Sequence, residues 1–293
     1  ENAVQVIDQP SKELSQELMG NVDVILATGG PAMVKAAYSS GKPSFGVGAG
    51  NVPCVIHSSA NIEQAVKDIM LSKCFDNGLI CSSEQAIIVT EDIADQVASE
   101  FEKQGAYILS KQEKAELKKV AFPEGVHPSP NVIGQYAKDI AQKAGMTLPE
   151  SQNKVLITRI CEIGPSDPFS GEKMSPILAL YITKSFEESG DVAKKILEYQ
   201  GTGHTADIHT TDMSVVEPSA LKVKASRIIV NQPSSTSAGG SKVNSLVPTT
   251  TLGCGSWGNN ASTDNISVKQ VINIKRIAYK LDTAKDTSKA FEL

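Results

Sequence analysis

The chain has 293 residues, of which 40% are hydrophobic and 21% are charged, an ordinary composition for a globular protein of roughly two domains. The formal net charge is −5, without a basic stripe or an acidic tail, so the charge pattern argues against nucleic acid as a partner. The apolar runs are far shorter than a membrane span, and nothing at the start resembles a signal peptide. We therefore expect neither nucleic acid nor a membrane as a partner.

Five cysteines are scattered along the chain, at Cys54, Cys74, Cys81, Cys161 and Cys254. An odd number without disulfide spacing is typical of a reducing compartment, which predicts a cytoplasmic protein. No pair has CxxC spacing, and the four histidines do not cluster with the cysteines in the sequence, so we expect no structural zinc site and no other metal. At most one thiol is expected to be reactive.

The first sixty residues alternate short apolar runs with helical patterns. They predict strands at 3–7, 22–27, 45–50 and 52–56, and helices at 11–19 and 31–38. The continuous apolar run at 22–27 indicates a strand buried on both faces of a parallel sheet. Pro31 suits the first position of the second helix, since its fixed φ is helical. A strand, a glycine turn, a helix and a strand together form a βαβ unit.

The α/β pattern continues after residue 60. Asn61 is expected to cap a helix with Gln64 at the reciprocal capping position, and the helix is expected to give out at 76–78. Phe101 and two apolar residues at four-residue intervals before it mark another helix, which Gly105 ends. Further strands are predicted at 85–89, 154–159, 177–182, 205–209 and 227–230, with a helix at 186–199 and a loop at 233–241.

Cys81 is the candidate nucleophile. It lies between a helix end and a strand, where nearby N–H dipoles would lower the pKa of a thiol from about 8.5. The polar residues around it, among them Asn77, Ser82 and Glu84, argue against an apolar environment. On this turn alone, a core cysteine is an equal alternative.

Two glycine turns are candidate ligand contacts. Thr28-Gly29-Gly30, before Pro31, would offer free N–H groups and a helix dipole to a phosphate, and Gly46 and Gly48 permit a close approach of backbone to a ligand. Taken alone, the first of these favours an ordinary tight turn between a strand and a helix, and a glycine-rich turn without a ligand is the alternative for the second.

His204 and Glu172 are the remaining candidates. The histidine would serve as a general acid or base, because its unperturbed pKa is near neutrality, and the glutamate would accept two ribose hydroxyls. A structural histidine and a solvated surface glutamate are the alternatives.

Six blocks in unbroken order carry a resemblance that the single motifs do not. They are ATGGPAMVKAAYSSGKP at 27–43, GVGAGN at 46–51, FDNGLICSSEQ at 75–85, EKMSP at 172–176, GTGHT at 201–205 and TLGCGSWG at 251–258. From about Val6 to Tyr279 the chain resembles the CoA-acylating aldehyde dehydrogenases, most of all the aldehyde dehydrogenase part of bifunctional aldehyde-alcohol dehydrogenases. Acylating succinate-semialdehyde dehydrogenases are nearly as similar.

The resemblance implies roles for single residues. Cys81 matches the nucleophile that forms a thioester, and His204 matches a histidine placed near it. The cofactor-binding residues implied for NAD, with NADP also open, are Thr28, Gly29, Gly30, Gly46, Gly48, Glu172 and Leu252. Coenzyme A is the implied co-substrate, and a homo-oligomer is the implied assembly.

Val47 is an informative departure from the wider family. It stands where hydrolytic aldehyde dehydrogenases carry the glutamate that activates water. Loss of a positioned base typically costs a factor of about 10² to 10⁴, so the acyl-enzyme is expected to wait for CoA. The implied reaction converts aldehyde, CoA and NAD⁺ reversibly into acyl-CoA and NADH.

The implied fold is α/β and aldehyde dehydrogenase-like, with a Rossmann-type nucleotide-binding part and an α/β catalytic domain. We expect residues 1–57 to complete the nucleotide-binding domain, 58–232 to form the catalytic domain, and 233–293 to pack back and make oligomer contacts. Relatives of this kind carry roughly another 150 residues before Glu1, which would include a side-chain amide of the oxyanion hole. Thr283–Leu293 gives no sign of an alcohol dehydrogenase domain.

Three other functions stay open on the sequence. An acyl-phosphate reductase of the glutamyl-phosphate reductase type shares the glycine block and the cysteine, but would use phosphate in place of CoA. A hydrolytic aldehyde dehydrogenase would oxidise aldehyde without CoA. An inactive structural unit of a filament would show no thiol reactivity at Cys81. The aldehyde itself is not determined by these residues.

Overall fold

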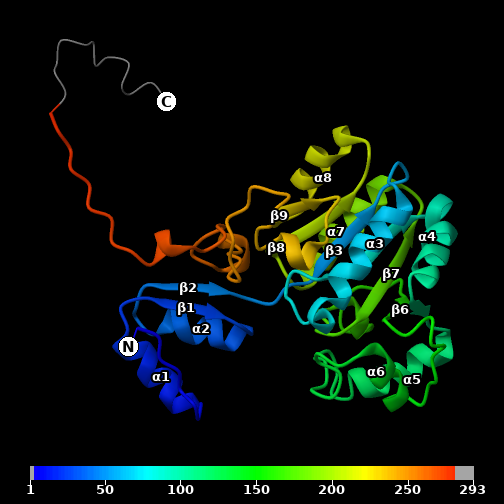
Figure 1. Ribbon diagram of the computed structural model, residues 1–293, viewed down its shortest axis with the longest axis horizontal. Helices are drawn as coiled ribbons and strands as arrows, with labels where there is room; N and C mark the ends of the chain where they lie inside the picture. Colours follow the sequence, from blue (N-terminus) through cyan, green and yellow to red (C-terminus); the bar gives the residue numbers. More distant parts are fainter. Residues whose placement is uncertain (1–2, 281–293) are drawn as a thin grey trace.

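The computed structural model describes residues 3–280, and it consists of two lobes (Figure 1). The small lobe (residues 12–47) contains a two-stranded parallel sheet, and the large lobe (residues 52–237) is built on a seven-stranded parallel sheet. Across residues 3–280, no helix combines the length and the apolarity that crossing a membrane requires.

The small lobe is the predicted βαβ unit with one helix before it. Its elements are α1 (Lys12–Asn21), β1 (Ile25–Thr28), α2 (Pro31–Ser39) and β2 (Ser44–Val47). Ser11 caps α1 by accepting a hydrogen bond from the N–H of Leu14 at 3.1 Å. Pro31 is the first residue of α2, as its fixed φ predicts.

Two predictions for this lobe are wrong. Residues 3–7 form no strand, and β1 is not buried on both faces. Ile25 and Ala27 pack against α2, whereas Leu26, which points to the opposite face of the strand, is 49% exposed. A continuous apolar run does not reveal how many layers cover it, and here one helix covers one face.

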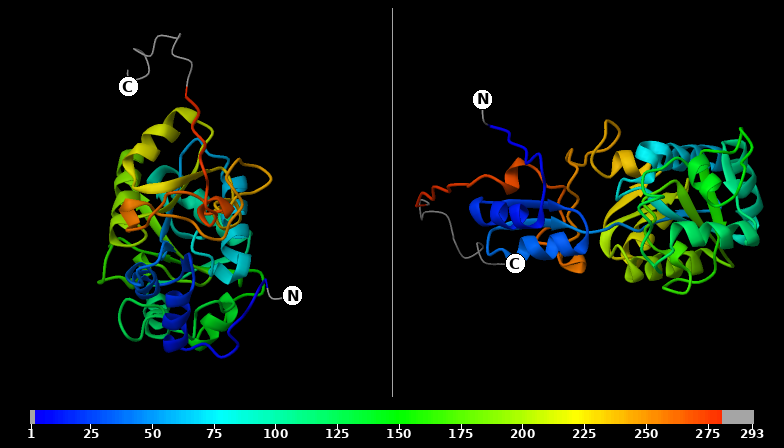
Figure 2. Two further views of the ribbon diagram at one scale, coloured as in Figure 1. Left: turned by 90° about the vertical axis from the view of Figure 1, so that its left-hand side faces the viewer. Right: turned by 90° about the horizontal axis from the view of Figure 1, so that it is seen from below.

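The large lobe is a sheet between two layers of helices (Figure 2). Its strands are β3 (Val52–Ile56), β4 (Glu84–Thr90), β5 (Ala106–Ile108), β6 (Val155–Arg159), β7 (Ile177–Thr183), β8 (Gly203–His209) and β9 (Ala225–Val230), in the order β5-β6-β7-β4-β3-β8-β9. Its helices are α3 (Ile62–Cys74), α4 (Glu91–Lys103), α5 (Lys111–Ala121), α6 (Ala137–Lys143), α7 (Phe186–Tyr199), α8 (Val216–Lys222) and α9 (Ser234–Ser237). One apolar cluster joins the sheet to α3 and α4, and another joins its opposite face to α5, α6 and α7.

Local predictions for the large lobe are confirmed in part. The predicted helix at 186–199 coincides with α7, and the predicted strands are present. Asn61 caps α3 by accepting from the N–H of Gln64 at 3.1 Å, but the Gln64 side chain donates to Asp68 and not back to the cap. The predicted loop at 233–241 contains the short helix α9.

The sheet topology bears on the domain division, which stays a prediction. Strand β3 lies within residues 1–57, yet it is a central strand of the large sheet and pairs with β4 and β8. This pairing favours a boundary between β2 and β3. The segment after α9 returns to the small lobe (Figure 1), where Tyr38 accepts a hydrogen bond from the N–H of Ala261 at 2.9 Å. The segment Thr283–Leu293 lies outside the described residues.

Candidate active site between the lobes

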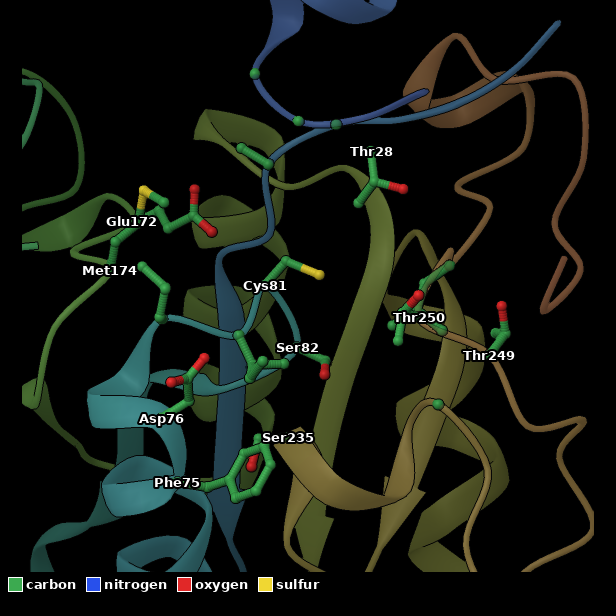
Figure 3. A pocket seen from close by; sticks show the side chains of 18 residues that line it. Thr28, Phe75, Asp76, Cys81, Ser82, Glu172, Met174, Ser235, Thr249 and Thr250 are labelled. Atoms are coloured by element: carbon green, nitrogen blue, oxygen red, sulfur yellow. The ribbon is translucent and has the colours of Figure 1, made fainter. Parts of the chain in front are cut away.

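A cavity of about 600 Å³ lies where the carboxyl ends of β1 and β2 meet the amino ends of the strands of the large sheet. Its lining includes Cys81 together with the predicted cofactor residues Thr28, Gly29, Gly30, Gly48, Glu172 and Leu252. Figure 3 shows the Cys81 side chain pointing into this space, with Thr28 and Thr250 across from it and Glu172 above. Residues from five separate blocks of the sequence thus converge on one cavity.

Cys81 is presented by a turn with unusual backbone conformations. After α3 ends at Cys74, Asp76 and Asn77 have φ values of 49° and 51°, and Gly78 has a φ of 70°. Left-handed non-glycine residues in succession are uncommon and are held here by tertiary contacts. One such contact is the hydrogen bond from Asn77 Nδ2 to the carbonyl of Gly134, at 2.9 Å. The turn is therefore held in one conformation before β4 begins at Glu84.

The surroundings of Cys81 are more buried than its polar neighbours suggest. Ser82, Ser83 and Glu84 are all buried, so the argument from polar neighbours is wrong even though Cys81 lines the cavity. Glu84 is accommodated because its Oε1 accepts from the N–H of Ser234 at 2.9 Å.

The electrostatics of the cavity also oppose the expected activation of the thiol. Burial, and after it the nearby carboxyl of Glu172, raise the pKa of Cys81 to about 11, against the opposite effects of a backbone N–H and Arg227. The expected lowering of the pKa by the turn is therefore not present in this chain alone. Deprotonation of Cys81 needs a proton acceptor or further positive charge in the cavity.

Glu172 is buried beside the nucleophile and is not a solvated surface residue. Its Oε1 accepts from the N–H of Gly50 at 3.3 Å, and its own N–H donates to Gln200 Oε1 at 2.9 Å. The adjacent Lys173 is fixed by hydrogen bonds from Nζ to the carbonyls of Phe169 and Gly171, at 2.8 and 2.7 Å. Burial raises the pKa of Glu172 to about 7. The carboxyl is thus positioned from both sides and titrates near neutrality.

The amino end of α2 fits the pyrophosphate of a dinucleotide. Gly30 is the N-cap of this helix and offers no side chain to the first-turn N–H groups, and no acidic residue lies in the first turn. A Cβ on Gly30 or Gly48 would meet nothing within 4 Å, so both face open space. Free N–H groups and the helix dipole favour an anion at such a position. Thr28 is held alongside by a 3.1 Å hydrogen bond between its hydroxyl and that of Thr251.

Two predicted site residues do not line the cavity. A Cβ on Gly46 would lie 2.6 Å from Val34 Cγ1, so this glycine lets α2 pack closely on β2. His204 is fully buried, its Nδ1 lies 3.0 Å from the Thr205 hydroxyl, and its Nε2 has no hydrogen-bond partner among residues 3–280. Burial and the charge of Arg227 lower the pKa of His204 to about 3. The ring is therefore neutral at neutral pH, which makes it a weak proton acceptor.

The structure also identifies contributors that single-residue reasoning missed. A Cβ on Gly50 would lie 1.9 Å from the carbonyl oxygen of Cys81, so only glycine permits the nucleophile turn to sit against β3. Arg227 donates to the carbonyls of His204 and Gly253, at 3.2 and 2.5 Å, and so holds the segment that carries Leu252. Gly50 lies in one of the quoted glycine blocks, whereas no local pattern marks Arg227.

The cavity thus combines a cysteine on a turn with a glycine-lined helix terminus. Residues 1–120 match the Aldehyde dehydrogenase family. The chain is 44% identical over 287 residues to the aldehyde-alcohol dehydrogenase of Streptococcus pneumoniae, covering 94% of this chain and 32% of that protein. It is 40% identical to the acetylating succinate-semialdehyde dehydrogenase of Clostridium kluyveri, covering 95% of this chain and 61% of that protein.

Solved structures agree with these relatives. An acetylating aldehyde dehydrogenase from Geobacillus thermoglucosidasius matches with a TM-score of 0.90 and 45% identity, over 95% of this chain and 61% of that chain. A propionaldehyde dehydrogenase from Rhodopseudomonas palustris, solved with bound CoA and an acylated cysteine, matches with a TM-score of 0.77 and 30% identity, over 88% and 58%. The chain is homologous to the acylating aldehyde dehydrogenases and has their fold. It spans about a third of the Streptococcus relative.

Proposed function

We propose that this chain carries the catalytic part of a CoA-acylating aldehyde dehydrogenase, which converts aldehyde, CoA and NAD⁺ reversibly into acyl-CoA and NADH. The observation that carries the proposal is that Cys81 and the glycine-lined terminus of α2 face the same cavity. The R. palustris relative, with CoA and an acylated cysteine, supports the same chemistry. The relatives do not favour an acyl-phosphate reductase or a structural unit.

In the proposed reaction, Cys81 Sγ adds to the aldehyde carbon and forms a thiohemiacetal. A dinucleotide with its pyrophosphate held at the amino end of α2, by Thr28, Gly29 and Gly30, would supply in its nicotinamide the acceptor for the hydride of that carbon. Cys81 then holds the acyl group as a thioester. The CoA thiol attacks the thioester carbonyl, and Cys81 leaves as the thiolate.

Val47 supports CoA as the acyl acceptor in place of water. Its side chain is 1% exposed and packs in an apolar cluster with Leu252 and Cys254, against which Cys81 is partly buried. The position thus presents no carboxylate to a water molecule beside the thioester. CoA, which brings its own nucleophilic thiol, has no need of a base at this position.

We propose two roles for Glu172, and one experiment distinguishes between them. As a carboxylate it would bind the ribose hydroxyls of the cofactor, and with a pKa of about 7 it would also accept the proton of Cys81. If it only binds ribose, Glu172→Gln raises KM for NAD⁺ and does not slow alkylation of Cys81 without cofactor, which should become faster because a carboxyl that raises the pKa of Cys81 is gone. If it accepts the proton, the same change slows alkylation near neutral pH.

The first test is NADH formation from acetaldehyde by the intact protein, with and without CoA. We expect activity that needs both CoA and Cys81, and its loss in Cys81→Ala. Cys161→Ala is the matched control, because this exposed cysteine does not line the cavity. Full activity without CoA would contradict the argument from Val47, and phosphate-dependent activity would favour the acyl-phosphate reductase.

Assembly and location are further parts of the proposal. We propose a homo-oligomer, supported by an end segment with exposed apolar side chains, namely Val268, Val271, Ile272, Ile274, Ile277 and Tyr279. We also propose a cytoplasmic location, supported by five cysteines that are all free.

A further inference from the structure

A second group of reactive side chains lies in the core of the large lobe, away from the cavity. Cys54 on β3 and Asp207 and His209 on β8 are all buried, and one potential ligand atom from each lies within 4.8 Å of the others. Cys54 pairs with Asp207 across the two parallel strands, and His209 lies two residues further along β8. Alternation along strands therefore puts the three side chains on one face of the sheet. None of the three lines the cavity that contains Cys81.

Three buried polar atoms of this group make no hydrogen bond within the described residues 3–280. Neither carboxylate oxygen of Asp207 nor Nε2 of His209 has a hydrogen-bond partner among residues 3–280. His209 Nε2 lies 3.4 Å from Asp207 Oδ2, and the side chains of His209 and Asp207 are 2% and 0% exposed. Apart from this contact with His209, the Asp207 carboxylate has no hydrogen-bond partner among residues 3–280, and a buried carboxylate is unfavourable unless a cation or hydrogen bonds compensate it.

The charges around the group add to this imbalance. Asp68 on α3 and Glu84 on β4 both act electrostatically on His209, and Glu84 and Asp207 both act on Cys54. The local groups are therefore three carboxyls, a thiol and one imidazole. Lys73 also interacts with Glu84, but its Nζ is engaged with the Glu84 carbonyl at 2.8 Å. A divalent cation would compensate the carboxylate of Asp207 and the thiolate that Cys54 becomes as a ligand.

We propose that Cys54, Asp207 and His209 bind a Zn²⁺ ion in the core of the large lobe. Thiolate, carboxylate and imidazole are the three ligand types that zinc prefers in proteins. Two ligands at about 2.0–2.1 Å from a tetrahedral zinc ion lie about 3.3 Å apart, close to the 3.4 Å between His209 and Asp207. On binding, the Cys54 thiol releases its proton to solvent and coordinates as the thiolate.

The proposed ion would be structural. It would join β3 and β8 on the sheet face that packs against α3, since Cys54 belongs to the same apolar cluster as the inner side chains of α3. Because the group is fully buried, the ion would enter during folding, when the ligands are still accessible. The proposal does not depend on the activity of Cys81.

The test measures zinc in the intact protein, produced in zinc-supplemented medium and dialysed before metal analysis. We expect one Zn²⁺ per chain in the wild type and in the control Cys161→Ser, whose cysteine is exposed and outside the group. We expect loss of the ion in Cys54→Val and His209→Gln. Circular dichroism and thermal unfolding verify that each variant is folded.

Cobalt provides a second measurement in case these variants do not fold. The wild type produced with Co²⁺ should show a thiolate-to-cobalt charge-transfer band, which reports a sulfur ligand directly. Wild-type protein without stoichiometric zinc and without this band would overturn the proposal. Folded Cys54→Val and His209→Gln proteins that keep the full zinc content would also overturn it.

Discussion

Gly50→Ala is the substitution for which the structure gives the sharpest expectation. The new Cβ would lie 1.9 Å from the carbonyl oxygen of Cys81 and 2.9 Å from its carbonyl carbon. Carbon and oxygen in ordinary contact are about 3.3 Å apart, so the two backbones must separate by more than an ångström. Both partners are main chain, and no flexible side chain is available to move instead.

The displacement should reduce activity more than stability. Overpacking of this kind costs about 1–3 kcal/mol, whereas a misplacement of about 1 Å at a reacting group can cost about 10² in rate. We therefore expect kcat to fall about 10²-fold in a protein that still folds. The Oε1 of Glu172 accepts from the N–H of Gly50, so KM for NAD⁺ should rise as well.

The assay compares NADH formation and thermal unfolding of the intact protein in wild type, Gly50→Ala and Gly20→Ala. Gly20 is the matched control, because it lies in α1 and a Cβ there would meet nothing within 4 Å. We expect the control to keep wild-type kcat. Wild-type kcat and stability in Gly50→Ala would refute the reasoning that this contact positions the nucleophile.

Three further predictions concern the chemistry of the cavity. Val47→Glu should increase CoA-independent aldehyde oxidation, by up to about 10²-fold, since it puts a carboxylate beside Cys81; no increase over Val47→Gln in the NADH assay would contradict this. Burial raises the pKa of Glu172 to about 7. Between about pH 4.5 and pH 7 the native state therefore keeps a proton that the unfolded chain has released. The free energy of unfolding should fall as the pH rises through this range. The contribution of Glu172 to the free energy of unfolding is about 3 kcal/mol at most. Urea unfolding at several pH values should therefore show a smaller loss of stability between about pH 4.5 and pH 7 in Glu172→Gln than in the wild type. Equal losses in the two proteins would show that the carboxyl is not buried in solution. Because the pKa of Cys81 is about 11, its alkylation by iodoacetamide without cofactor should accelerate about tenfold per pH unit above neutrality. Mass spectrometry of the Cys81 peptide measures this rate. A rate that reaches a plateau near neutral pH would mean that the pKa of the thiol is lowered.

Local signals in the sequence were sufficient for much of the secondary structure. Pro31 begins α2, Asn61 caps α3, and the apolar periodicity at 186–199 coincides with α7. These features depend on neighbours within one or two helical turns, where hydrogen bonds and side-chain periodicity act locally. The acylating aldehyde dehydrogenase relationship was likewise predictable, because six ordered blocks carried it.

Predictions that depended on the surroundings of a residue were less successful. The polar sequence around Cys81 did not reveal that its neighbours are buried or that burial raises its pKa. His204, expected to be an acid or base, is enclosed beside Arg227 and held neutral. Desolvation and charge act through space and are set by elements distant in the sequence.

The sequence by itself determined many of the strands and helices, the family relationship and the identity of Cys81 as a candidate nucleophile. Only the tertiary structure decided which faces are covered, as the exposed Leu26 shows, and which backbones approach closely, as Gly50 shows. It also placed Cys54 beside His209, although their spacing in the sequence gave no sign of a metal site. The physical reason is that parallel strands pair across long crossover connections, so that neighbours in the sheet are not neighbours in the chain.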